Sequence, residues 1–228
     1  TTPPLSDAGL FAITGPTGAG TSTLLAALCL LVLLLAAALL ERGVLATAGH
    51  LVKGLDPGAR VTLRTEAGGQ TTVEAVLIAV SRELDLALLR PPSGFSLPVP
   101  TADAPVAAYL PLAAAGSVPV RDPAVQALRR RVDGTATGDT LRIPGVGPGL
   151  IARLVGVAPG FSGGPVLDDR GRLVGMIVAI RRRPASGSAF APRQPASATT
   201  VEEALVLPAS ALRAEARHLL ATRAASLR

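Results

Sequence analysis

From residue 50 onward, the chain alternates short apolar runs with residues that form turns. The runs are four to nine residues long, and clusters rich in glycine, proline and aspartate separate them, as at residues 56–58, 91–94 and 168–171. This spacing is typical of the short strands of a β-sandwich or β-barrel. The predicted strands cover residues 61–64, 72–80, 84–89, 106–112, 150–157 and 173–180.

The C-terminal part carries a different pattern. Residues 181–200 are rich in arginine, proline, serine and alanine, which indicates a long mobile loop. A helix is predicted after Pro208, with Ser210 as its N-cap and Leu212, Leu219 and Leu220 on its buried face.

Residues 24–40 form an unbroken run of 17 apolar residues. A membrane-spanning helix needs roughly 20 such residues, with about 17 as the lower limit. No basic residue precedes the run and Arg42 follows it, which is weak evidence for any orientation in a membrane. One interpretation is therefore a single membrane helix over residues 24–40.

Composition narrows the classes of protein. Hydrophobic residues make up 49% of the chain and aromatic residues 2%, so the core must consist of leucine, valine and alanine. Cys29 is the only cysteine, which excludes an intrachain disulfide. The net charge of +6 comes partly from the arginine runs 129–131 and 181–183. These runs lack interleaved aromatic residues, so we expect solvated loops and no nucleic-acid partner.

The segment Gly-Phe-Ser-Gly-Gly-Pro at residues 160–165 contains the strongest candidate for chemistry. Glycines around Ser162 leave its hydroxyl uncrowded and let backbone N–H groups converge on one point. An acyl-transfer enzyme needs this combination of an exposed nucleophile and donors for an oxyanion.

A serine nucleophile also needs a base and a group that orients the base. His50 follows an apolar stretch, whereas His218 lies in the charged C-terminal helix, so His50 is the better candidate base. Asp85 is an acid within an apolar segment, and a buried carboxylate there requires a partner. Taken alone, Asp85 could also be a solvent-facing residue at a strand edge. Two histidines and one cysteine predict no metal site, and the chemistry needs no cofactor.

Three segments together resemble the trypsin-like (chymotrypsin-fold) serine proteases. Residues 44–50 are similar to the histidine motif of that family, residues 85–89 to its aspartate motif, and residues 160–165 to its serine motif, in the family's order. Within that family, the chain resembles the cysteine-poor bacterial HtrA-type members, because it lacks cysteine pairs and because residues 167–175 are similar to their hairpin after the serine. The resemblance is to members without a PDZ domain. Phe161 stands where trypsin has an aspartate that pairs with a new N-terminus, so activation by that ion pair is not expected.

The resemblance implies an all-β fold of two six-stranded antiparallel barrels with a C-terminal helix. The first domain, residues 1–110, would carry His50 and Asp85, and the second, residues 111–228, would carry Ser162. On this alignment residues 9–14 and 20–26 are the first two strands, followed by an apolar, helical or membrane-touching insertion near residues 27–40. We favour this arrangement over one membrane helix across residues 24–40.

The resemblance also implies a serine endopeptidase that acts on polypeptides. Ser162 would attack the carbonyl, His50 would transfer the proton, and Asp85 would orient His50. The N–H groups of Gly160 and Ser162 would form the oxyanion hole. The small or apolar pocket predicts a preference for small or aliphatic side chains, and its lining would be Gly156, Met176, Ile177, Val178 and Ala179. By likeness to relatives, the location would be extracytoplasmic, either periplasmic or secreted, with a membrane contact possible through residues 24–40. The oligomeric state has no sequence signal.

Three other functions fit parts of the sequence. Residues 15–22 have the glycine spacing of a phosphate-binding loop, but Thr21 stands where such a loop needs lysine. A relative that kept the fold as a binding or sensing module would differ from the enzyme by lacking turnover of an unfolded substrate. The same site could also act as an esterase, although the order of the motifs favours peptides.

Overall fold

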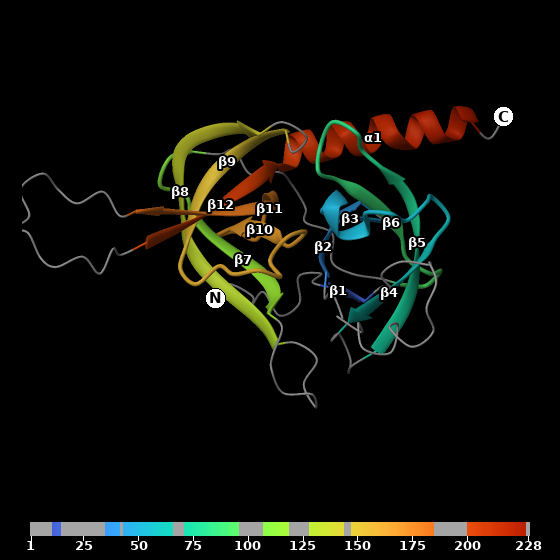
Figure 1. The fold of residues 1–228 in the computed structure, drawn as a ribbon, viewed down its shortest axis with the longest axis horizontal. Coiled ribbons are helices and arrows are strands. Elements are labelled where there is room, and N and C mark those ends of the chain that lie inside the picture. Colours follow the sequence, from blue (N-terminus) through green and yellow to red (C-terminus); the bar gives the residue numbers. More distant parts are fainter. Residues whose placement is uncertain are drawn as a thin grey trace, which may run out of the picture.

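Two closed antiparallel barrels and a C-terminal helix make up the computed structural model (Figure 1). The structure describes residues 11–14, 35–41, 43–65, 71–95, 107–118, 128–143, 147–184 and 200–226. Each barrel has six strands, as predicted, so the fold class is confirmed as chymotrypsin-like.

The first barrel is formed by the first six strands, which pair in the order β1-β2-β3-β6-β5-β4 and close through β1 and β4. Alternate residues point into it, because side chains of a strand face opposite sides in turn. Among the side chains that the structure describes, those buried in its interior are Leu45, Val52, Val61, Ala75, Leu77, Ala87 and Leu89. The strands are β1 (Phe11–Thr14), β2 (Leu35–Glu41), β3 (Val44–Thr47), β4 (Arg60–Thr65), β5 (Thr71–Val80) and β6 (Ala87–Arg90).

The second barrel pairs in the order β10-β11-β12-β9-β8-β7 and closes through β10 and β7. Of the side chains described in its interior, Phe161 is the largest that is fully buried. The strands are β7 (Pro111–Val118), β8 (Leu128–Ile143), β9 (Gly147–Leu154), β10 (Pro165–Asp168), β11 (Leu173–Pro184) and β12 (Thr200–Pro208).

A third core joins the barrels to the helix α1 (Ala209–Ser226). Outward-facing residues of the first barrel, such as Ala46 and Leu88, meet Met176 and Leu207 of the second barrel there. The helix starts at the end of β12 and runs across the first barrel (Figure 1). Its start at Ala209 places Ser210 inside the first turn, so the prediction of Ser210 as N-cap was wrong. Leu212 is buried and Leu219 and Leu220 are partly buried, as expected.

The apolar run at residues 24–40 required a correction. Residues 35–41 are strand β2, which pairs with β1 through Phe11 and Ala37 and with β3 through Leu39 and Leu45. A single helix over the run is therefore wrong, and so is an insertion reaching residue 40. Leucine and alanine favour helix in isolation, but closure of the barrel requires a strand between β1 and β3. The predicted strand at residues 20–26 lies outside the described residues.

Among the helices that the structure describes, none combines the length and the apolar character needed to cross a membrane. Membrane contact, an extracytoplasmic location and the division at residue 110 stay predictions.

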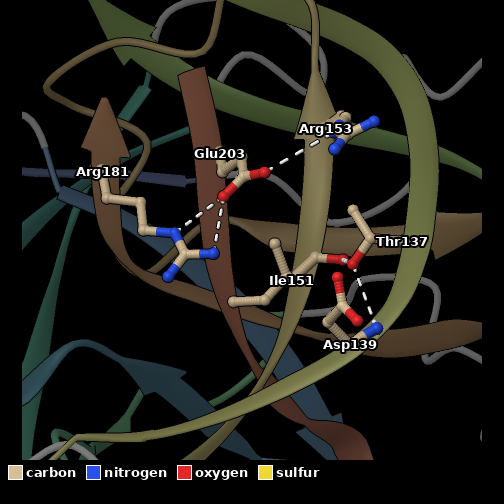
Figure 2. A network of polar contacts seen from close by, with 6 residues as sticks. All are labelled: Thr137, Asp139, Ile151, Arg153, Arg181 and Glu203. Carbon is tan, nitrogen blue, oxygen red and sulfur yellow. Dashed lines mark hydrogen bonds and ion pairs between the residues drawn. The ribbon is translucent and has the colours of Figure 1, made fainter. Parts of the chain in front are cut away.

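Both arginine runs belong to strands, not to solvated loops as predicted. Residues 129–131 lie in β8, and Arg181–Pro184 of the predicted loop extend β11, which pairs with β12. Figure 2 shows the reason at the second run: Arg181 and Arg153 both approach the buried carboxylate of Glu203, at 2.7 Å and 3.5 Å. Opposite charges on neighbouring strands stabilise their pairing, and composition alone did not reveal these partners. Residues 185–199 lie outside the described part of the chain.

Several strand boundaries also differ from the predictions. The longest strand, β8, was missed because polar residues separate its few buried positions, such as Val132 and Ala136. Predicted strands at 84–89, 106–112 and 150–157 are shifted along the chain relative to β6, β7 and β9. Before β6, Leu84 and Leu86 lie in the loop and pack into the core. Residues 107–109 before β7 and Val155 after β9 lie in exposed turns instead. Apolar character therefore does not by itself predict strand pairing.

Candidate active site

The His50 and Asp85 side chains are directly joined. The ring Nδ1 of His50 lies 2.6 Å from Oδ2 of Asp85, and the backbone N–H of His50 donates to Oδ1 over 2.7 Å. The side chain of His50 is 46% exposed and that of Asp85 is 10% exposed. The Asp85 carboxylate is thus shielded from solvent and is held by the backbone N–H and the ring of His50, while the imidazole stays accessible.

Neighbouring strands bring these two residues together. His50 lies in the 3-10 turn Gly49–Val52 directly after β3, and Asp85 lies in the bend before β6. Strands β3 and β6 pair with Thr47 opposite Ala87, so the end of one meets the start of the other. Gly49 leaves room for the contact, since an added Cβ there would be 3.2 Å from Oδ1 of Asp85.

The pairing determines the proton arrangement of the imidazole. A carboxylate only accepts hydrogen bonds, so the short contact places a proton on Nδ1 of His50. In the neutral ring, Nε2 then carries a free lone pair, and this is the atom that can accept a proton. Asp85 therefore sets the tautomer that a general base requires.

The turn at residues 160–164 presents Ser162 at the other barrel. Gly160 and Gly163 have φ angles of +102° and +84°, a region that favours glycine. Three N–H groups of the turn already donate to backbone carbonyls: Phe161 to Ala158, Gly163 to Ile177 of β11 and Gly164 to Phe161. The N–H groups of Gly160 and Ser162 donate to no acceptor in the described chain. The two donors predicted for the oxyanion hole are thus available.

Phe161 anchors this turn in the second barrel. In the sequence, Phe161 stands between Gly160 and Ser162, whose N–H groups are available. Its side chain has no exposed surface and lies in the core of the second barrel. Gly116 of β7 lies against it, and an added Cβ there would come within 2.5 Å of the phenyl ring. The anchor is an apolar contact, consistent with the absence of an acid at position 161.

We expect Phe161→Ala to destabilise the protein by about 3–5 kcal/mol, because it leaves a cavity under the turn. Phe161→Leu keeps most of the apolar volume and should lose much less. Chemical denaturation of both variants measures this difference. Equal stability of Phe161→Ala and the wild type would contradict the assignment of Phe161 as the anchor.

The residues predicted to line the substrate pocket lie beside the serine turn. Gly156 is in the turn after β9, with a φ of +81°. Four others follow one another on β11: Met176, Val178 and Ala179 pack against the core between the barrels, whereas Ile177 faces the barrel interior. Ala179 is half-buried. The predicted lining is therefore uncharged, and most of it also belongs to the packed core.

His50 is hydrogen-bonded to Asp85, but the hydroxyl of Ser162 makes no hydrogen bond to His50. Such contacts are often long in the absence of substrate.

Sequence reasoning missed Gly116, because a glycine within a strand gives no signal of what approaches it. In the part of the chain that the structure describes, no three histidine, cysteine, aspartate or glutamate residues cluster as metal ligands would.

The two barrels, the histidine–aspartate pair and the glycine-rich serine turn define a trypsin-like protease. The family profile described as the trypsin-like peptidase domain matches residues 37–176, which cover more than half of the chain and include His50, Asp85 and Ser162. The chain belongs to this family.

Two solved structures have the same fold. One is the inactive form of the Rv3671c protease, with a TM-score of 0.61 and 16% identity, covering 92% of this chain and 88% of that one. The other is an inactive serine-to-alanine mutant of Rv3671c from Mycobacterium tuberculosis H37Rv, with a TM-score of 0.62 and 16% identity, covering 97% and 96%. At this identity the likeness concerns the fold alone. The closer resemblance to HtrA-type proteases stays a prediction.

A third similarity is short. Over 27 residues the chain is 85% identical to the SbcC component of the nuclease SbcCD from Pseudomonas aeruginosa, which amounts to 12% of this chain and 2% of that protein. The chain therefore spans a very small part of that curated relative, and the match shows no shared family.

Proposed function

We propose that this protein is a serine endopeptidase that hydrolyses polypeptides with a triad of His50, Asp85 and Ser162. The double hydrogen bond from His50 to the Asp85 carboxylate carries this proposal. It orients the imidazole and sets its tautomer, which a base for serine activation requires and a purely structural histidine does not.

In the proposed reaction, Nε2 of His50 takes the hydroxyl proton as Oγ of Ser162 attacks the peptide carbonyl. The N–H groups of Gly160 and Ser162 bind the resulting oxyanion, and Asp85 stabilises the imidazolium. His50 then gives its proton to the leaving amine, which leaves an acyl group on Ser162. Water activated by His50 hydrolyses that acyl-enzyme and restores the serine. The uncharged lining supports a preference for small or aliphatic side chains.

A second candidate is a binding or sensing module of weak or no activity. The observation that favours it is the missing hydrogen bond between Ser162 and His50. Turnover of an unfolded protein separates the two functions, because a binding module would retain peptide affinity without cleavage.

Labelling with a fluorophosphonate probe tests the proposal, because the probe reacts only with an activated serine. We expect the wild type to be labelled, Ser162→Ala to lose labelling and His50→Ala to lose most of it. His218→Ala is the matched control, since His218 is exposed on α1, and it should be labelled like the wild type. A folded wild type that is not labelled would contradict the proposal.

A further inference from the structure

The short loop that carries Asp85 is organised around Ser81. The backbone N–H of Ser81 donates to the carbonyl of Leu86 over 2.8 Å and closes the loop. Its hydroxyl oxygen accepts the N–H groups of Glu83 at 3.2 Å and Leu84 at 3.0 Å. The position of Asp85 therefore depends on the position of the Ser81 side chain.

A residue from the other end of the chain holds that side chain. The Ser81 hydroxyl donates to Oε1 of Glu215 in α1 over 2.6 Å. A hydroxyl has one proton and two lone pairs, and the two loop N–H groups already occupy the lone pairs. The proton has Glu215 as its acceptor, so all three bonding positions of the Ser81 hydroxyl are used.

The position of Glu215 on α1 allows its contact with Ser81. It is the only acid among the residues of α1 and lies on the inward face together with Leu212, Ala216 and Leu219. Two turns further on, Arg223 donates to the carbonyl of Ile78 in β5. Helix α1 is thus fixed to the end of β5, where the Asp85 loop begins. Figure 1 shows the helix crossing the first barrel, to which β5 belongs.

A second contact, made by β9, also holds the loop. Leu84, next to Asp85, lies over Gly147 of β9, where an added Cβ would come within 2.3 Å of its Cδ2. Leu84 also packs against the core between the barrels. Two elements outside the first barrel, α1 and β9, therefore support the loop that orients His50.

We propose that Glu215 is a positioning residue for the active site, acting through Ser81 on the loop that carries Asp85. This inference rests on the proposed function, because it takes the His50–Asp85 pair as part of the catalytic machinery. It makes docking of the C-terminal helix a condition for correct geometry of that pair. The helix would then contribute to the rate of catalysis as well as to stability.

Two substitutions of Glu215 in the full chain test this inference. Glu215→Leu keeps a helix-forming residue but removes the acceptor, whereas Glu215→Gln keeps an acceptor oxygen. We expect Glu215→Leu to lower kcat about tenfold with little change in KM, which is less than the roughly hundredfold cost of a 1 Å misplacement. Glu215→Gln should recover most of this loss. Arg217→Leu, on the exposed face of the same helix, is the matched control.

Amide hydrogen exchange gives a readout that needs no turnover. The His50 amide, bonded to Asp85, should exchange about tenfold faster in Glu215→Leu than in the wild type, because the loop is less ordered. Ser81→Ala should have at least as large an effect, because it also removes the acceptor of the Glu83 and Leu84 N–H groups. Adding Glu215→Leu to Ser81→Ala should change little further, because both act through one contact. If Glu215→Leu does not fold, Ser81→Ala decides by the same two measurements.

The outcomes separate the two proposals. An active wild type whose kcat and His50 exchange are unchanged by Glu215→Leu would overturn the positioning role and leave the proposed function intact. An inactive wild type would overturn the proposed function, and exchange at His50 would then decide the coupling alone. Slower turnover in Arg217→Leu equal to that in Glu215→Leu would also overturn the inference, since a general effect of the helix would explain both.

Discussion

Ser162→Ala is expected to lower kcat on a peptide substrate by about a millionfold, because loss of the nucleophile removes the acyl-enzyme route. Some catalysis above the rate in water should remain, since the N–H groups of Gly160 and Ser162 are backbone groups and persist in the variant. The side chain of Ser162 makes no hydrogen bond in the described chain, so the stability should hardly change.

The measurement is the rate of cleavage of an unfolded protein or a fluorogenic peptide at saturating concentration. Ser93→Ala, at an exposed turn far along the chain, serves as the control and should cleave like the wild type. Activity of Ser162→Ala within tenfold of the wild type would show that another residue is the nucleophile.

Asp85→Asn should lower kcat by about 10,000-fold through a change of tautomer. In the wild type the two carboxylate oxygens accept the backbone N–H and the Nδ1–H of His50. An amide has only one oxygen, and the fixed backbone N–H requires it. The amide nitrogen must then face Nδ1, so the imidazole proton moves to Nε2 and the lone pair needed by the base is lost.

Nitrogen NMR of the His50 ring reads the tautomer directly, and peptide cleavage reads the rate. Asp139→Asn, an equal change on the exposed part of β8, should alter neither. If Asp85→Asn retains the Nδ1–H tautomer, the structural basis of the prediction is wrong, whatever the rate.

The candidate site was accessible to sequence reasoning because its chemistry is concentrated in short segments. The glycines around Ser162 are explained by local geometry, since the φ angles of Gly160 and Gly163 favour glycine. Asp85 was noticed because an acid in an apolar segment needs a partner, and the structure places His50 there. In both places the reason for the residue type lies within a few residues of it.

The support of the site was not accessible in the same way. Ser81 and Glu215 are separated by 134 residues, and neither is unusual in its own segment. Gly116 and Phe161 likewise meet only because β7 and the serine turn share one barrel core. Such pairs depend on how the strands close in space, which no local pattern encodes.

The sequence by itself determined the class of fold, the three candidate catalytic residues and the glycine-rich turn, because strand spacing and turn chemistry are local properties. Tertiary structure decided that residues 35–41 form a strand and that the arginines of β11 lie opposite residues of β12. It also decided the hydrogen bond between Glu215 of α1 and Ser81 of the Asp85 loop. These depend on barrel closure and on contacts between distant segments, and there the free energy of packing overrides the preference of each segment.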